Sequence, residues 1–167
     1  DEDFLKASTL SLNQLYNAVN NGAGKVDLYN NYAYKGSGDR QDRIPILRDV
    51  TIDGHGITID GANSAAIFYV EGKVIFKNIK FKNCYGYDGA GAAIYIYSGN
   101  CQLINCIFDN NSALKSGGAV YTDSGDCKLI NCNFIENKAE FGGAVVFEGT
   151  GSVTGCNFDN NSAESAG

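Results

Sequence analysis

The sequence is poor in the residues that nucleic-acid binding and membrane insertion require. Its 13 Lys and Arg are outnumbered by 19 Asp and Glu, which gives a formal net charge of −6. Contacts with nucleic-acid phosphates need clustered basic side chains, so nucleic acid is not expected as a partner. No run approaches the roughly 18 apolar residues of a membrane-spanning helix. We therefore expect no direct membrane insertion in this segment.

Histidine and proline are also scarce, with one of each. His55 lies between Gly54 and Gly56, and no serine or cysteine nucleophile is tied to it. A catalytic triad needs its partners within reach, so we interpret His55 as a turn residue. We expect no catalytic residue, no metal site and no cofactor.

What the chain has in quantity is glycine and apolar residues. It contains 21 Gly, which suits many tight corners, and 44% of its 167 residues are hydrophobic. This length supports one substantial core and does not require two. We therefore expect one folded domain over residues 1–167.

One phrase of 13 residues occurs three times, at 101–113, 127–139 and 151–163. A weaker copy at 74–84 places phenylalanine at 81, and the later copies place it at 108, 134 and 158. Self-similarity at such a period is the signature of a solenoid. The coils carry Asn, Gly and β-branched residues in period-two alternation, which disfavours an α-helical solenoid. The fold class predicted is all-β: a single-stranded, right-handed parallel β-helix.

Spacing within the phrase predicts where each coil bends. Side chains alternate along a strand, so a step of three from Leu103 to Cys106 requires a corner between them. Further corners are expected at an asparagine column, whose amides can hydrogen-bond along the stack, and at the repeated glycines. The three sets are Asn78, Asn105, Asn131 and Gly155; Asn111, Asn137 and Asn161; and Gly91, Gly117-Gly118 and Gly142-Gly143.

Residues 11–22 have a different pattern, and we expect a short amphipathic helix there. Ser11 and Gln14 form a capping-box sequence, and apolar residues follow at helical spacing. This helix is predicted to cap the first of the coils, which span 26–167. Residues 30–45 are predicted to form a projecting loop, either a ligand-contacting arm or a solvated cap loop. We favour the cap loop.

Both ends of the sequence suggest a longer natural protein. The chain opens with Asp1-Glu2-Asp3 and no methionine, so we expect a mature or trimmed chain. Residues 161–167 stop in mid-phrase, and we expect more coils to follow. The last coil would then expose core near Cys156 and Phe158. A monomer is expected, with end-to-end association through this coil as an alternative.

Five of the six cysteines occupy repeat positions. Such inward positions favour buried free thiols over disulfides, because in-register side chains run parallel and do not point at each other. Three disulfides are the competing interpretation. Cys84 stands at the asparagine corner, and its role is open. The two columns are Cys101 and Cys127, and Cys106, Cys132 and Cys156, with Ile79 in the equivalent place of an earlier coil.

A surplus of tyrosine predicts the binding site. Tyr95 and Tyr121 each follow an aliphatic residue that we place inside, so alternation places the rings outside, where they can stack on sugars or contact proteins. The alternative, with tyrosines inward and aliphatics outward, stays open because a one-residue slip exchanges the faces. The candidate binding residues are Tyr95, Tyr97, Tyr121, Asp123 and Glu148.

These repeats resemble the right-handed β-helix region of adhesin-like cell-surface proteins of methanogenic archaea. The motifs that carry the resemblance are residues 51–61, the Phe-x-x-Asn-x-Ala phrases and the Gly-Gly-Ala-Val pairs at 117 and 142. The last two are also similar to repeats of the polymorphic outer-membrane adhesins of chlamydiae. The resemblance implies an extracellular, cell-surface protein.

The resemblance leaves three functions open. We favour a non-catalytic adhesin segment that binds glycan or protein on another cell. The same pectate-lyase-like fold also occurs in polysaccharide lyases and glycoside hydrolases, and a structural stalk is the third interpretation. Asp123 and Glu148 are equivalent acids, but no arginine lies in these repeats, so an acidic solvated edge is favoured over a catalytic pair.

Overall fold

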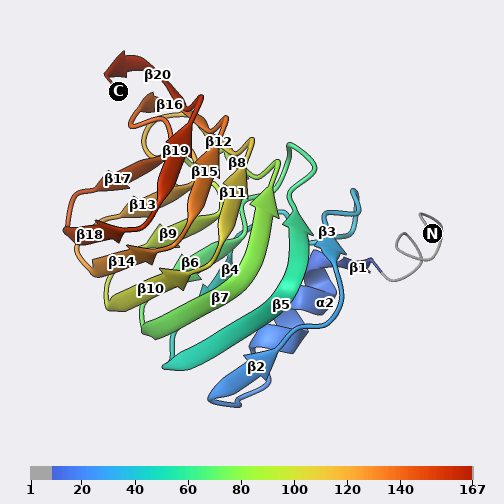
Figure 1. Ribbon diagram of the computed structural model, residues 1–167. Helices are drawn as coiled ribbons and strands as arrows, with labels where there is room; N and C mark the ends of the chain where they lie inside the picture. Colours follow the sequence, from blue (N-terminus) through green and yellow to red (C-terminus); the bar gives the residue numbers. More distant parts are fainter. Residues whose placement is uncertain (1–8, 167) are drawn as a thin grey trace.

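The computed structural model describes residues 9–166 and shows a solenoid of stacked coils (Figure 1). The coils build three parallel sheets, here called sheets A, B and C, and sheet C begins only at Tyr85. The all-β parallel β-helix predicted from the repeats is confirmed. Asp1-Glu2-Asp3, on which the expectation of a trimmed chain rested, lies outside the described residues.

Sheet A is the longest and bends around a corner within each coil. It contains β1 (Leu10–Ser11), β2 (Lys25–Asp27), β3 (Tyr32–Ala33), β5 (Val50–Asp60), β7 (Lys73–Lys82), β10 (Asn100–Ile104), β11 (Ile107–Asp109), β14 (Asp126–Ile130), β15 (Asn133–Ile135), β18 (Thr150–Thr154) and β19 (Asn157–Asp159).

Sheets B and C form the other sides of the coils. Sheet B contains β4 (Ile44–Ile46), β6 (Phe68–Val70), β9 (Ile94–Ile96), β13 (Val120–Thr122) and β17 (Val145–Phe147). Sheet C contains β8 (Tyr85–Gly86), β12 (Ser112–Ala113), β16 (Lys138–Phe141) and β20 (Ser162–Ala166).

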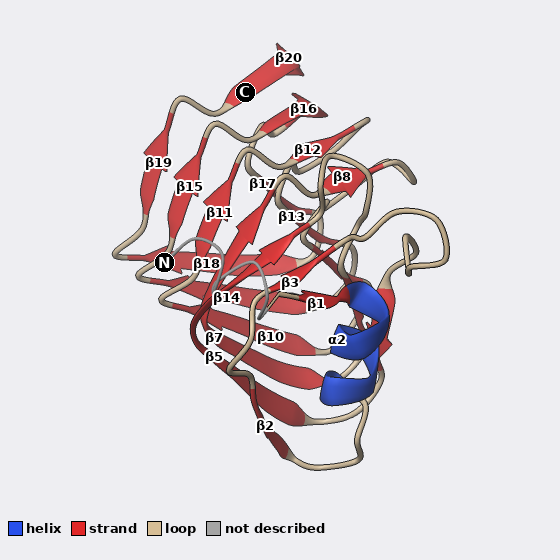
Figure 2. Ribbon diagram, turned by 90° about the vertical axis from the view of Figure 1, so that its right-hand side faces the viewer, coloured by secondary structure: helices blue, strands red, loops and turns tan. Residues whose placement is uncertain are grey.

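The one helix of the described chain, α2 (Leu12–Val19), lies at the N-terminal end of the coils (Figures 1 and 2). Ser11 is its N-cap, and its side chain and that of Gln14 form the expected capping box. Leu12, Leu15 and Val19 are buried and join the core of the coils. The helix thus covers core that the first coil would otherwise expose. It ends at Val19, within the predicted 11–22.

The first corner adopts the left-handed conformation that its residue types suggested. Its four positions have φ between 53° and 65°, a region that asparagine and glycine tolerate best. The predicted corner is therefore confirmed in each of these coils. The residues are Asn78, Asn105, Asn131 and Gly155.

At the second corner, two neighbouring residues have different roles. The residue before each ladder asparagine takes the positive φ, as Asn110 does at 56°. Asn111 itself points inward, and its Nδ2 donates to Asn137 Oδ1 at 3.0 Å. Asn137 Nδ2 in turn donates to Asn161 Oδ1 at 2.9 Å. The predicted amide ladder is confirmed, and the strained backbone lies one residue earlier.

Ladders of like residues also fill the core. Phe108 and Phe134 stack with ring centroids 4.7 Å apart and planes 5° from parallel. Cys101 pairs in register with Cys127, and five of the six cysteines are buried. The predicted inward columns are thus confirmed for Cys101, Cys127, Cys106 and Cys132, whereas Cys156 in the last coil is partly exposed. Cys84 is buried where the asparagine column ends, and its backbone N–H donates to Asn111 Oδ1 at 3.0 Å.

The prediction of one loop over residues 30–45 is wrong. Tyr32–Ala33 forms β3 and pairs with β5, and Ile44–Ile46 forms β4 and begins sheet B. Ile44 and Ile46 are buried while Pro45 between them is less so, which shows an ordinary alternating strand. Only the residues between β3 and β4 connect them as a loop. Arg40 from this loop stacks 4.4 Å over the Tyr16 ring of α2.

Candidate functional site

The outer face of sheet B carries a ladder of tyrosines. In β9, Ile94 and Ile96 are buried in the core, and Tyr95 between them points outward. The parallel register places Tyr69 and Tyr121 directly on either side of Tyr95. Their ring centroids lie 5.8 and 5.2 Å from that of Tyr95. The outward orientation expected from alternation is confirmed, and the alternative with inward tyrosines is wrong.

Carboxylates accept the hydroxyl hydrogens of this ladder. Tyr69 donates to Glu71 Oε1 at 2.7 Å, and Tyr95 donates to Asp123 Oδ2 at 3.3 Å. Burial raises the pKa of Tyr121, and its hydrogen bond to Glu148 raises it further. These acids therefore fix the rings. Glu71 lies in the same coil as Tyr69, whereas Asp123 and Glu148 come from the coils after Tyr95 and Tyr121 and act first as structural acceptors.

Tyr121 is less accessible than the sequence suggested. Its residue is only 8% exposed, because the glycine loops fold against the outside of sheet B. A Cβ added to Gly91 would lie 2.9 Å from the Tyr121 Cβ. Tyr97, the residue after β9, is 46% exposed and stacks on Tyr69 with centroids 6.0 Å apart. The accessible aromatic surface is thus centred on Tyr97 and Tyr69.

Arg43 holds the neighbouring loop against this face. Its guanidinium forms two 2.7 Å hydrogen bonds with the Asp88 carboxylate and lies 5.3 Å over the Tyr95 ring. It also donates to the backbone carbonyls of Ala90 and Gly91. Burial acts to raise the pKa of Asp88, but Arg43 together with backbone hydrogen bonds lowers it overall. The Arg43 side chain is 8% exposed, and its charge is already paired with the Asp88 carboxylate.

These residues line an open hollow of about 340 Å³, whose lining is Arg43, Tyr69, Asp88, Tyr95 and Tyr97. We call it the tyrosine groove. Its volume is at the lower end of the roughly 300–1,000 Å³ typical of small-ligand sites. One wall is aromatic and the other carries the Arg43–Asp88 pair, so the groove offers ring faces together with carboxylate acceptors.

The structure gathers the five candidate residues on one face and adds others that the sequence did not reveal. Tyr95 and Tyr97 line the groove, and the other three continue the ladder beyond it: Tyr121, Asp123 and Glu148. Arg43 and Asp88 are 45 residues apart in the chain, so no local pattern joins them. Tyr69 could have been found by extending the column of Tyr95 one coil toward the N-terminus.

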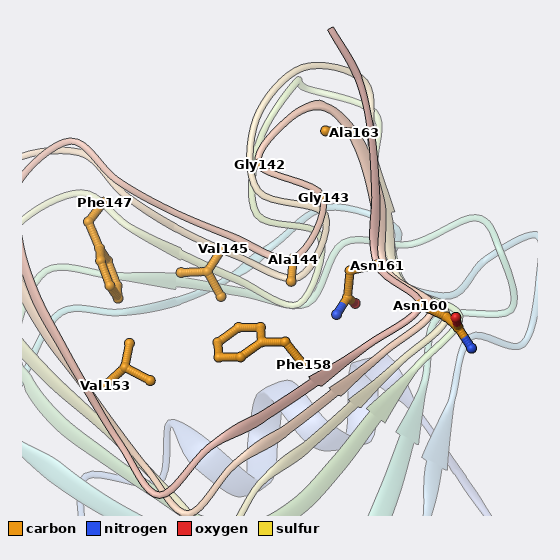
Figure 3. Close-up of a pocket in the computed structure, with 10 residues that line it drawn as sticks. All are labelled: Gly142, Gly143, Ala144, Val145, Phe147, Val153, Phe158, Asn160, Asn161 and Ala163. Atoms are coloured by element: carbon orange, nitrogen blue, oxygen red, sulfur yellow. The ribbon is translucent and has the colours of Figure 1, made fainter. Parts of the chain in front are cut away.

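A second cavity, of about 460 Å³, lies at the last coil (Figure 3). Figure 3 shows Phe158 and Val153 beside Phe147, on the positions that form the core in earlier coils. Phe158 and Val153 are 49% and 47% exposed. This cavity is therefore the cross-section of the core, and we do not interpret it as a ligand-binding site. The predicted exposure near Phe158 is confirmed for the described chain.

Comparison with protein families gives one match. The family model for the right-handed β-helix region matches residues 5–166. No curated protein and no solved structure matches the chain significantly. Within residues 9–166, no helix is long and apolar enough to cross a membrane. The match covers nearly the whole chain and agrees with the parallel coils, so the chain belongs to the right-handed β-helix family.

Proposed function

We propose that this chain is a non-catalytic segment of an extracellular adhesin and that its tyrosine groove binds a neutral glycan of another cell. The observation that carries the proposal is the pairing of exposed Tyr97 with Tyr69 beside a row of carboxylates. Aromatic rings stack on the apolar faces of sugars, and carboxylates accept hydrogen bonds from sugar hydroxyls. The adhesin role and the cell-surface location rest on the resemblance of the repeats.

The charge around the groove favours a neutral ligand over an acidic one. Arg43 is the only arginine lining the groove, and it is paired with Asp88. Glu71 and Asp123 lie at the hydroxyl ends of the ladder. A polyuronate or sialylated glycan would meet these carboxylates, and the described residues that line the groove offer it no unpaired cation. Like charges repel.

Stacked coils also suggest how weak contacts can together give attachment to a cell. Equivalent residues recur about 4.8 Å apart along a β-solenoid, so an extended glycan can touch several coils in a row. Affinity for one groove is expected to be modest. Many copies on a surface multiply it through effective concentration.

A glycan array with neutral and acidic members tests the proposal, followed by calorimetry with the strongest neutral binder. Tyr97→Ala should weaken binding about two- to tenfold, which corresponds to roughly 0.5–1.5 kcal/mol for one aromatic contact. The matched control is Tyr29→Ala, since Tyr29 is 72% exposed and outside the groove. It should bind like the wild type.

Other outcomes would overturn the proposal. A preference for acidic glycans would contradict the electrostatic argument. Release of reducing ends from a polysaccharide would show an enzyme. An array with no bound glycan, together with no attachment to cells, would indicate a structural stalk. Binding only to deglycosylated cell-surface protein would indicate a protein ligand.

A further inference from the structure

The single histidine lies against two aspartates at the first corner of β5. His55 Nε2 is 2.8 Å from Asp27 Oδ1. One ligand atom from each of Asp27, Asp53 and His55 lies within 4.8 Å of the other two. We propose that these three side chains form a binding site for a divalent transition-metal ion, with Zn²⁺ as the best fit.

Strand register brings the two carboxylates together. β2 and β5 are parallel neighbours, and Asp27 pairs directly with Asp53. His55 follows two residues later, where the ladder between β5 and β7 shifts register. Its φ of 50° turns it back toward Asp53. A Cβ added to Gly54 would lie 2.4 Å from the Ile79 side chain, so glycine lets this corner pack closely.

Neighbouring groups hold the three side chains in place. The His55 ring stacks on Tyr29, with centroids 4.7 Å apart and planes 11° from parallel. Asp53 Oδ1 accepts from the Asn78 amide at 3.1 Å and from the His55 backbone N–H at 3.0 Å. Within the described chain no hydrogen bond uses Asp53 Oδ2. Groups that orient ligands in this way raise metal affinity.

The set of donors selects the class of ion. Calcium and magnesium prefer oxygen ligands alone, whereas an imidazole nitrogen with carboxylates suits zinc, nickel or cobalt. Three protein ligands with an open fourth position are the arrangement of an accessible zinc site. Ligands about 2.0–2.1 Å from tetrahedral zinc lie about 3.3 Å apart. The distance between His55 Nε2 and Asp27 Oδ1 must therefore lengthen by about half an ångström. Asp53 now faces the other ring nitrogen, with its Oδ1 3.9 Å from His55 Nδ1, so the exposed imidazole must also turn for all three donors to meet one ion.

Two lysines already neighbour the site, and one of them, Lys77, pairs in register with Asp53. Lys25 Nζ is 3.9 Å from Asp27 Oδ1, and the Lys25 side chain is 69% exposed. A side chain this exposed can move into solvent, and its ion pair with Asp27 contributes little free energy. Asp27 and His55 are 28 residues apart in the sequence. The pattern around His55 alone therefore predicted a turn and no metal, an expectation that the proposal replaces.

Isothermal titration of the protein with Zn²⁺ tests the proposal, with Co²⁺ absorption as a report on the ligands. The wild type should bind one ion. His55→Asn keeps a residue that tolerates positive φ and should weaken binding at least tenfold, as should Asp27→Asn. The Co²⁺ spectrum should lack thiolate charge-transfer bands. Glu164→Gln, at the other end of the solenoid, is the matched control and should bind like the wild type.

Two results would contradict the site. The first is an absence of both binding heat and thermal stabilisation in excess Zn²⁺. The second is equal binding by the wild type, His55→Asn and Asp27→Asn, which would place the ion elsewhere, for example on a cysteine. Circular dichroism shows whether each variant is folded. The two substitutions lie in different strands, so if one variant misfolds, the other still tests the site.

Discussion

Asn137 is the middle rung of the asparagine ladder, and its replacement by alanine should destabilise the protein strongly. Its side chain is fully buried. Nδ2 donates to the Phe108 carbonyl at 3.0 Å and to Asn161 Oδ1 at 2.9 Å. Oδ1 accepts from the backbone N–H and the amide of Asn111 at 3.1 and 3.0 Å. Asn137→Ala removes all four bonds together.

The magnitude follows from these four contacts. A hydrogen bond contributes about 0.5–1.5 kcal/mol net, and a buried group left without a partner costs about 1–3 kcal/mol. The buried Asn111 N–H would lose its partner at this corner, and the Phe108 carbonyl would lose the second of its hydrogen-bond donors. We therefore expect a loss of about 3–5 kcal/mol, a large share of the roughly 5–15 kcal/mol typical of a folded domain.

Urea unfolding followed by circular dichroism measures this loss. With an m-value of about 2 kcal/mol/M, the midpoint should fall by about 2 M. Because stacked repeats need not unfold in one step, near-ultraviolet tyrosine signals should be followed alongside. The matched control is Asn157→Ala. Asn157 is exposed and donates to Asn133 Oδ1 at 3.0 Å, so its loss should cost no more than about 0.5 kcal/mol.

A loss below about 1 kcal/mol for Asn137→Ala, or equal losses for the two variants, would refute the reasoning. It would mean that water or a backbone shift replaces the lost bonds. A changed m-value would instead indicate an altered unfolded or native state.

Three further predictions concern packing, ionisation and the thiols. Gly118→Ala should destabilise the protein by about 1–3 kcal/mol or more, because the added Cβ would lie 2.2 Å from the Gly143 oxygen. Gly24→Ala is the control, since a Cβ there meets open space. Equal unfolding midpoints for the two variants would contradict this prediction. Burial and Glu71 raise the pKa of Tyr69, and burial and Asp42 raise that of Tyr87 to about 12. Folded-state pKa values above the unfolded value of about 10 mean that stability is full below pH 10 and falls above it. Spectrophotometric titration of the folded protein should show some tyrosines ionising above pH 10. A single transition at the ordinary tyrosine pKa would contradict this prediction. The five buried cysteines should react with a thiol reagent only after denaturation, and three disulfides by intact mass would reverse that expectation.

Much of the fold was predictable because each coil repeats the same steric demands. Asn105 had to take a corner because Leu103 and Cys106 both face the core three residues apart, and its φ of 53° agrees. The helix cap followed from Ser11 and Gln14 in the same way. These are local requirements, which a sequence records directly.

What could not be predicted depends on contacts between distant or irregular segments. Strands β3 and β4 are two and three residues long, too short to show alternation within a glycine-containing loop. The burial of Tyr121 depends on how closely Gly91 lets a loop approach. Arg43 reaches Asp88 across 45 residues, and only the stacking of coils makes them neighbours.

Chemical-shift mapping on isotope-labelled protein locates a bound glycan most directly. The probe is the neutral oligosaccharide that binds most strongly on the array, titrated into the wild type. Binding in the tyrosine groove predicts that the largest shifts fall on Tyr69, Tyr95 and Tyr97 and that they shrink in Tyr97→Ala. Shifts that cluster instead on sheet C or around Phe158, or that persist unchanged in Tyr97→Ala, would contradict it.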